Sequence, residues 1–526
     1  MMKALLPLLL AAASATPTAS LAETVSPLAW TSCGTDEHLP NAVAARTECS
    51  TLVVPRDYGN PTAGTLALDV VRVVANSERG ARHDGVLLLE PDEFASSAIR
   101  AVQGTAAMWL HGNEAWRNVS RRLDVVGLAQ RRMDEAEGHD CLSATSALPR
   151  PAALGTVVTT PNFVMAEGLA LAIATACQND PMHTHVGVRR RIEDVDRLRE
   201  ALGQPRLHLL GVGRGGWIAT RYAERYPQNV GRMLLDSSWD IDGSVAEAME
   251  ARVEERGRTL RRVISQVVGT PHRYGWGAEA APIHRRIAQL PDWAHAAWAT
   301  HVRDVADLLA LLGMGRLLER DPALTTQGLR DALATTRLST GDEDEAAALA
   351  SANRFLDGVD AGRFTDAYGF GSRAASSSPA QLATAFATRC NDGRWGGQQR
   401  YWRQRTRELH EAWPSSVGNE TFQGMVCSKW PGNSGEARVP VLNTAPSFLM
   451  VHAEFDEEAP LRNAVIGLHG HAKARMVVAR GLRAHGVATR HDRPCVSEIT
   501  GRFLADGVVP DAKLINCALP EPTSAP

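Results

Sequence analysis

A glycine-rich turn, Gly211-Val212-Gly213-Arg214-Gly215, joins two segments of different periodicity. Residues 206–210 are apolar at alternate positions, which predicts a strand, and residues 217–223 have the spacing of an amphipathic helix. A sharp strand-to-helix turn of this kind can carry a nucleophile in the pattern Gly-x-Ser-x-Gly. Here Gly213 stands at the central position, so the sequence predicts the turn without its attacking hydroxyl.

The wider pattern predicts an α/β fold with a mostly parallel central sheet and an inserted helical lid. Runs typical of strands alternate with helical or loop stretches, and strand signals return after a long helical segment. The strands are expected at 66–74, 85–89, 123–128, 207–212, 232–236, 447–453 and 475–479, and long helices at 246–263, 293–312 and 399–413. The predicted units are a signal peptide (1–22), a first core part (23–243), a lid (244–430) and a C-terminal core part (431–526).

The first 22 residues are typical of a cleaved secretory signal. Lys3 precedes an apolar run over residues 4–13, and Ser20-Leu21-Ala22 supplies small residues at the exit. We expect cleavage after Ala22 and a periplasmic or secreted product. No later run of about 18 apolar residues predicts a membrane span.

Eight cysteines form an even set in a chain expected to be exported, which favours disulfide bonds. Pairing neighbours along the chain is the simplest connectivity, although sequence alone leaves the pairing open. The neighbouring pairs are Cys33 with Cys49, Cys141 with Cys177, Cys390 with Cys427, and Cys495 with Cys517.

Composition limits the partners of the chain. The 526 residues carry a formal net charge of -3, which provides no electrostatic footprint for nucleic acid. The pairs His183/His185 and His469/His471 lack a third ligand at matching spacing, so no metal site is expected. Neither a metal nor an organic cofactor is predicted, and oligomeric state is left open.

Two residues late in the chain suit the remaining roles of a catalytic triad, whose order is nucleophile, acid, histidine. Asp456 follows the strand expected at 447–453, where an orienting carboxylate belongs. His485 follows the strand expected at 475–479. A histidine held by a carboxylate can act as a general base.

With these features the chain resembles the secreted tripeptidyl aminopeptidases and their proline-iminopeptidase-like relatives, a serine peptidase family with the α/β-hydrolase fold. The resemblance implies that Asp456 and His485 take the acid and base positions, that Gly213 takes the position of the serine, and that the Arg214 backbone N–H lies at the oxyanion position. The motifs that carry it are Val53-Val54-Pro55-Arg56-Asp57-Tyr58, Asp194-Val195-Asp196-Arg197-Leu198-Arg199, Tyr222-Ala223-Glu224-Arg225-Tyr226-Pro227, Leu235-Asp236, Cys390-Asn391-Asp392, Cys427 with Trp430-Pro431, Asp456 with Pro460, His485-Gly486 and Cys495.

Two further segments depart from that family. Its Gly-Gly-Pro-Gly run, which supplies an oxyanion N–H, is replaced by Glu90-Pro91-Asp92-Glu93-Phe94, so carboxylates, with Glu90 first, are expected near the oxyanion position. Its Asp-x-Arg-Gly turn is replaced by Ala129-Gln130-Arg131-Arg132. Loss of a catalytic serine costs on the order of 10⁶ in turnover, and loss of one oxyanion donor a further ~10²–10³. The sequence therefore predicts a catalytically impaired or inactive homologue.

Several functions are compatible with these residues. The protein can retain a binding site for a peptide or another small ligand between core and lid, with Asp456 and His485 kept as a buried pair. It can instead be an aminopeptidase or esterase in which His485 activates water, or in which another nucleophile, such as Ser237 or Ser238, replaces the serine. A remote alternative is a dinucleotide-binding oxidoreductase, because Gly211, Gly213 and Gly216 with Asp236 match that fingerprint.

Overall fold

The computed structural model describes most of the chain after residue 25. The described residues are 26–33, 39–76, 83–93, 97–132, 140–298, 301–362, 368, 370, 377–396, 398–430, 440–488, 490 and 493–518. The predicted signal peptide and its cleavage position lie outside these residues.

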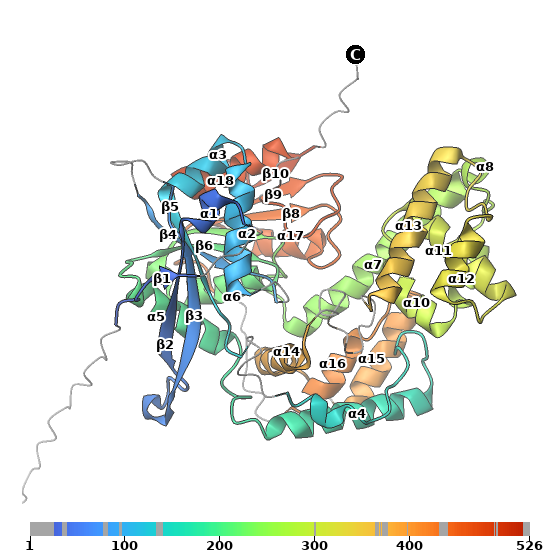
Figure 1. Ribbon diagram of the computed structural model, residues 1–526, viewed down its shortest axis with the longest axis horizontal. Helices are drawn as coiled ribbons and strands as arrows, with labels where there is room; N and C mark the ends of the chain where they lie inside the picture. The colour runs from blue at the N-terminus through green and yellow to red at the C-terminus, as the bar shows by residue number, and fades with distance from the viewer. Residues whose placement is uncertain are drawn as a thin grey trace, which may run out of the picture.

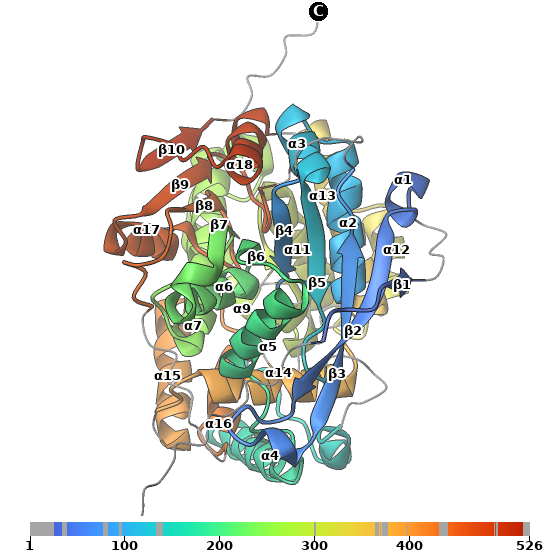
Figure 2. The same cartoon turned by 90° about the vertical axis from the view of Figure 1, so that its left-hand side faces the viewer.

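A ten-stranded sheet forms the centre of the core, in the order β1-β2-β3-β5-β4-β6-β7-β8-β9-β10 (Figures 1 and 2). The pairs from β5 to β10 are parallel, whereas β1, β2 and β3 are joined antiparallel to one another and to β5. The strands are β1 Thr31–Ser32, β2 Thr47–Pro55, β3 Thr65–Val73, β4 Gly85–Glu90, β5 Leu123–Leu128, β6 Leu207–Val212, β7 Val230–Asp236, β8 Phe448–Ala453, β9 Ala474–Ala479 and β10 Leu514–Cys517. The predicted mostly parallel sheet is confirmed, although β1, β2 and β10 were not predicted.

Helices cover both faces of the sheet, and for this reason every residue of the central strands β5 and β8 is buried. One face carries α2 Ala98–Leu110, α3 Glu114–Arg122 and α18 Pro494–Asp506, and the other carries α5 Val188–Ala201, α6 Arg214–Arg225 and α17 Leu461–Gly470 (Figure 2). The short helices of the core are α1 Asn41–Ala44 and the 3₁₀ turns Pro61–Ala63, Ser143–Thr145 and Pro227–Asn229.

The insertion between β7 and β8 begins with the long helix α7, Val245–Gly269, whose first turn is fixed by a capping box between Ser244 and Glu247. Beyond it lies an outer bundle with its own apolar core, which includes Trp298, Leu308 and Phe355 (Figure 1). Its helices are α8 Pro271–Tyr274, α9 Ala280–Ala288, α10 Asp292–Trp298, α11 Val305–Arg320, α12 Thr326–Leu333 and α13 Asp342–Asp360.

The prediction of one helix over 293–312 is wrong, because this segment contains two separate helices, α10 and α11. The Asp304 side chain accepts a hydrogen bond from the Asp307 N–H and caps a new helix at Val305. An N-cap residue has non-helical backbone, so Asp304 interrupts a segment that is otherwise rich in helix formers.

A second set of helices, the inner helical layer, lies below the core and α7 in the view of Figure 1. It contains α14 Pro379–Asp392, α15 Gln399–Ala412 and α16 Glu420–Cys427, together with α4 Thr160–Gln178, which precedes the insertion in the chain. Arg403 of α15 binds Glu167 of α4 at 2.7 Å. Residues from the first core segment therefore contribute to the helical layer, and the predicted unit boundaries stay a prediction.

Within the described residues, α4 is the one helix with the length and apolar composition of a membrane span. Only 44% of its apolar window is buried, yet it packs in the helical layer through Phe163 and Cys177. Buried core helices of soluble proteins pass the same test of length and composition.

The structure forms four disulfides between sequence neighbours: Cys33–Cys49, Cys141–Cys177, Cys390–Cys427 and Cys495–Cys517. Their Cα–Cα distances lie between 4.8 and 5.7 Å, which suits a disulfide. The neighbour pairing is therefore confirmed. Such bonds are typical of proteins that fold in an oxidising compartment.

Removal of Cys390–Cys427 is expected to loosen the inner helical layer, because this bond joins α14 to α16. We expect the double variant Cys390→Ala/Cys427→Ala to lose about 2–5 kcal/mol of unfolding free energy, since a cross-link restricts the unfolded chain. Urea denaturation followed by circular dichroism measures the change. An unchanged midpoint would contradict this role.

Candidate active site

The glycine-rich turn has the geometry that its sequence predicts. Gly213, between β6 and α6, has φ +55° and ψ −121°, a conformation that glycine adopts without the strain of a Cβ. Its N–H donates to the Asp236 carbonyl at 3.0 Å, and its carbonyl accepts from the Trp239 N–H at 3.2 Å. The turn therefore persists as a sharp elbow although it carries no side chain.

The carboxylate of Asp92 fills the space in front of this elbow. A Cβ built on Gly213 would lie 2.3 Å from Asp92 Oδ1 and 2.5 Å from its Cγ, far inside van der Waals contact. The same Oδ1 accepts a hydrogen bond from the backbone N–H of Arg214 at 3.0 Å. A side chain from the loop after β4 thus occupies the place of a nucleophilic side chain and uses the N–H at the oxyanion position.

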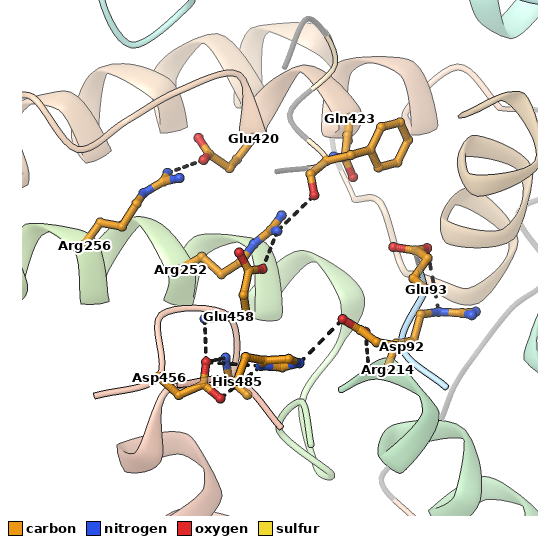
Figure 3. A network of polar contacts seen from close by, with 12 residues as sticks. Asp92, Glu93, Arg214, Arg252, Arg256, Glu420, Gln423, Asp456, Glu458 and His485 are labelled. Carbon is orange, nitrogen blue, oxygen red and sulfur yellow. Dashed lines mark hydrogen bonds and ion pairs between the residues drawn. The ribbon is translucent and has the colours of Figure 1, made fainter. Parts of the chain in front are cut away.

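His485 lies between Asp92 and Asp456 (Figure 3). Its Nδ1 is 3.0 Å from Asp456 Oδ2, and its Nε2 is 3.5 Å from Asp92 Oδ2. Asp456 is buried and also accepts from the backbone N–H groups of Glu458 and Ala459. The structure therefore brings the predicted acid and base together beside the elbow, in a row that Asp92 completes.

The two carboxylates determine the charge of His485. Burial by itself lowers the pKa of a histidine, but the charge and hydrogen bond of Asp456, followed by the interactions with Asp92, raise the pKa of His485 well above 6.5. At neutral pH the side chain is therefore an imidazolium paired with carboxylates on both sides. An imidazolium cannot accept a proton from water.

Loss of this charge is expected to destabilise the protein in alkaline solution. Because the folded pKa of His485 lies above the unfolded one, its stabilising contribution is complete below about pH 6.5 and is lost as the pH rises through the folded value. We expect Tm to fall more steeply with rising pH in the native protein than in His485→Gln. Thermal melts across neutral and alkaline pH measure the difference, and parallel curves would contradict the prediction.

Arginines neutralise the carboxylates of Glu90, the last residue of β4, and of Glu93 in the loop that follows. Arg191 forms a bidentate pair with Glu90, with two N–O distances of 2.9 Å. Arg389 Nε lies 2.8 Å from Glu93 Oε2. Arg214 pairs through its side chain with Asp392 and lies 3.9 Å from Glu93.

The structure corrects the prediction that Glu90 lies at the oxyanion position. Its carboxylate pairs with Arg191 of α5, whereas Asp92, two residues later, accepts the hydrogen bond from the Arg214 N–H. The altered loop was recognisable in the sequence as a source of carboxylates near this site. Which of its side chains reaches the elbow depends on the direction of the loop after β4, and this has no local sequence signal.

The side chains of Ser237, Ser238 and Asp236, which the alternative functions require, make structural hydrogen bonds instead. The Ser237 hydroxyl accepts from the Gly486 N–H at 3.0 Å, and the Ser238 hydroxyl donates to the Trp239 carbonyl at 2.9 Å. Both serines are buried. In a dinucleotide-binding protein the carboxylate of Asp236 would bind a ribose. Here it accepts hydrogen bonds from two backbone N–H groups of the loop after His485.

One histidine of each pair considered as metal ligands in the sequence has another partner in the structure. Among the residues that the structure describes, no three His, Cys, Asp or Glu side chains are grouped to hold a metal ion. His471 pairs with Asp242 at 2.8 Å, and His183 Nδ1 lies 2.6 Å from the Asp180 carbonyl. These histidines have structural partners.

Two buried donor atoms close to the site have no hydrogen-bond partner in the described part of the chain. They are Nε of Arg214 and Nε2 of Gln423. They come from α6 of the core and from α16 of the inner helical layer (Figure 3). A buried unsatisfied donor costs about 1–3 kcal/mol, so these atoms favour an acceptor-bearing group at the boundary of core and lid.

Comparisons with known proteins agree with this architecture. The family described as "alpha/beta hydrolase fold" matches residues 177–311, and the one described as "TAP-like protein" matches residues 414–516. A tripeptidyl aminopeptidase from Streptomyces lividans is 24% identical over 94% of this chain and 87% of its own length. The serine protease Hip1 from Mycobacterium tuberculosis is 26% identical over 42% of this chain and 41% of its own.

A serine hydrolase from Cycloclasticus zankles has a TM-score of 0.35 and 10% identity, covering 86% of this chain and 97% of that one. The match over residues 177–311 contains the elbow, and the match over residues 414–516 contains Asp456 and His485. Most of the lid lies between the two. The chain is thus an α/β-hydrolase-fold protein related to the tripeptidyl aminopeptidases.

Proposed function

We propose that this protein has no serine-peptidase activity and acts as a ligand-binding relative of the tripeptidyl aminopeptidases. The observation that carries the proposal is the position of Asp92, whose carboxylate fills the space of the nucleophilic side chain. The same carboxylate takes the Arg214 N–H that would stabilise an oxyanion. The attacking group of a serine peptidase is therefore absent, and one of its oxyanion donors is already occupied.

The ligand proposed for this site is a peptide or another small molecule bound between core and lid. The unsatisfied donors Arg214 Nε and Gln423 Nε2 support an acceptor-bearing group, such as a carbonyl or a carboxylate. Gln423 belongs to α16 and Arg214 to the core, so one ligand would contact both layers.

Direct activation of water by His485 has little support from the geometry. Its Nε2 faces the Asp92 carboxylate at 3.5 Å, and the raised pKa of the ring keeps this nitrogen protonated. A general base must accept a proton at its operating pH.

We further propose that the chain is exported to the periplasm or the medium and cleaved after Ala22. The four disulfides support an oxidising compartment. N-terminal sequencing of protein recovered from outside the cytoplasm should begin at Glu23, and recovery of intact chain from the cytoplasm would contradict this proposal.

The function is tested by turnover and by covalent labelling of the purified protein. We expect no release of chromophore from tripeptidyl anilides or simple esters, no labelling by a fluorophosphonate, and no difference between the native protein and His485→Ala. Thermal shift with unlabelled tripeptides tests binding. Turnover or labelling that disappears in His485→Ala would overturn the proposal and require a nucleophile elsewhere.

A further inference from the structure

We propose that the outer bundle carries a binding site for a small carboxylic acid, in a groove whose central group is the guanidinium of Arg316. The inference does not rest on the proposed function, because the outer bundle is separated from the sheet by α7 (Figure 1). The groove has a volume of about 350 Å³, which is enough for a small ligand. Its walls come from the end of α8 and the loop after it, from α11 and from the loop before α13, with the side chains of Tyr274, Trp276, Arg316, Arg337, Ser339 and Thr340.

The guanidinium of Arg316 is held by an aromatic ring and has its hydrogen-bond donors left over. Its Cζ lies 3.5 Å from the centroid of the Trp276 ring, which is a close cation–π contact. Arg316 forms no ion pair and no hydrogen bond with any residue in the described part of the chain. A guanidinium that stacks on a ring uses its face, so the N–H groups in its plane stay available for an anion.

The surroundings of Arg316 favour an added negative charge. Burial, followed by the charges of Arg286 and Arg320, lowers the pKa of Arg316, and Glu319 opposes this effect. Glu319 is itself paired with Arg286. Because arginine stays protonated in proteins, a lowered pKa means that its charge is destabilised where it lies, and a bound anion would offset this.

The walls of the groove are fixed before any ligand binds. Gly275, with φ +75°, ends α8 and turns the chain into Trp276, whose Nε1 donates to the Leu338 carbonyl at 3.4 Å. On the facing loop, the Leu338 N–H donates to Glu345 Oε2 at 2.8 Å. Walls that are already ordered lose little conformational entropy when a ligand binds.

The charge of the groove selects a carboxylate. Arg337 supplies a second cation, but its Nη2 lies 2.7 Å from Oδ1 of Asp342. Arg316 and Arg337 with Asp342 therefore leave one positive charge in excess, which suits a carboxylate better than a phosphate group of about −1.5 to −2. A carboxylate also matches the planar fork of a guanidinium in a bidentate pair.

The aromatic side chains indicate the remainder of the ligand. Tyr274 is 9% exposed, and its hydroxyl forms no hydrogen bond with a residue that the structure describes. Together with Trp276 it offers apolar ring surface and one free polar group beside the cation. Both an aromatic acid and a sugar acid have this chemistry, a ring that carries a carboxylate.

Ligand-observed NMR titrations of the full mature chain test the site. Benzoate and D-glucuronate are expected to bind, and benzamide and D-glucose, which lack the charge, are expected not to bind. The tighter of the two acids identifies the ring as aromatic or as a sugar. Failure of both acids, equal binding of a neutral analogue, or tighter binding of inorganic phosphate would overturn the proposal.

Variants on α11 assign the binding to Arg316. Arg316→Met should weaken the affinity for the acid by about 10–100-fold, because a hydrogen-bonded charge pair is lost. Arg316→Lys keeps the charge without the fork and should also bind more weakly than the native protein. Arg320→Met, which removes an exposed arginine of the same helix, is the matched control and should bind as the native protein does.

The outcomes of the variants separate this site from the site at the elbow. Unchanged binding in Arg316→Met would place the acid elsewhere, and an equal loss in Arg320→Met would reduce the effect to overall charge. Native affinity in Arg316→Lys would show that the fork does not matter. Each of these three results would overturn the proposal while leaving the absence of peptidase activity intact, and thermal melts confirm that the variants are folded.

Discussion

Gly213→Ser alone is expected to remain inactive towards tripeptidyl substrates, whereas Gly213→Ser/Asp92→Ala is expected to gain about 10³-fold in turnover. In the single variant the new Cβ would lie 2.3 Å from Asp92 Oδ1, and the backbone at φ +55° strains any L-residue by ~1–3 kcal/mol. Removal of the Asp92 carboxylate provides the space and frees the Arg214 N–H for an oxyanion.

The size of the gain follows from two known costs. A complete triad supplies on the order of 10⁶ in turnover, and the lack of one oxyanion donor removes ~10²–10³ of it. Hydrolysis of a tripeptidyl anilide and fluorophosphonate labelling measure the gain, with Asp92→Ala as the control that lacks a serine. Equal activity in the single and double variants would show that Asp92 does not block the elbow.

Arg191→Met is expected to lower the unfolding free energy by about 3–5 kcal/mol, the largest stability effect that we expect from one substitution in this protein. It leaves Glu90 buried and without its bidentate partner, and it removes donors to the carbonyls of Leu128 and Ala129. An uncompensated buried charge is far more costly than the loss of a solvated ion pair. Urea unfolding measures the change.

Two variants distinguish the buried charge from a general effect of losing an arginine. Glu90→Gln/Arg191→Met should recover a large part of the loss, because no unpaired charge then remains. Arg117→Met breaks an exposed pair with Glu114, whose side chains are 45% and 59% exposed, and should cost about 0–1 kcal/mol. A similar loss in Arg117→Met and Arg191→Met would contradict the assigned role of burial.

The sheet was predictable because its signals are local. The apolar runs of β5 and β6 and the glycines of the elbow determine conformation within a few residues. Asp456 and His485 could be located because each follows a recognisable strand, and the carboxyl ends of parallel strands meet at one edge of the sheet.

The position of Asp92 was not predictable, because it depends on contacts between segments far apart in the chain. The loop after β4 offers several carboxylates, and their assignment depends on arginines of α5, α6 and α14. The location of α4 in the helical layer had no local signal either, since its partner α15 comes after most of the lid. Pairing of charges across such separations leaves no periodicity in the sequence.

The place of the lid between β7 and β8 has a consequence for the order of folding. Strands β7 and β8 are neighbours in the sheet, where Asp236 pairs with Val451, but the whole insertion separates them in the chain. Closing so long a loop is entropically costly unless the loop first becomes compact through local helical contacts. The outer bundle, with its own apolar core, can supply that compaction. We therefore expect the Asp92 row to assemble late, after the insertion has folded and brought the second half of the sheet to the first.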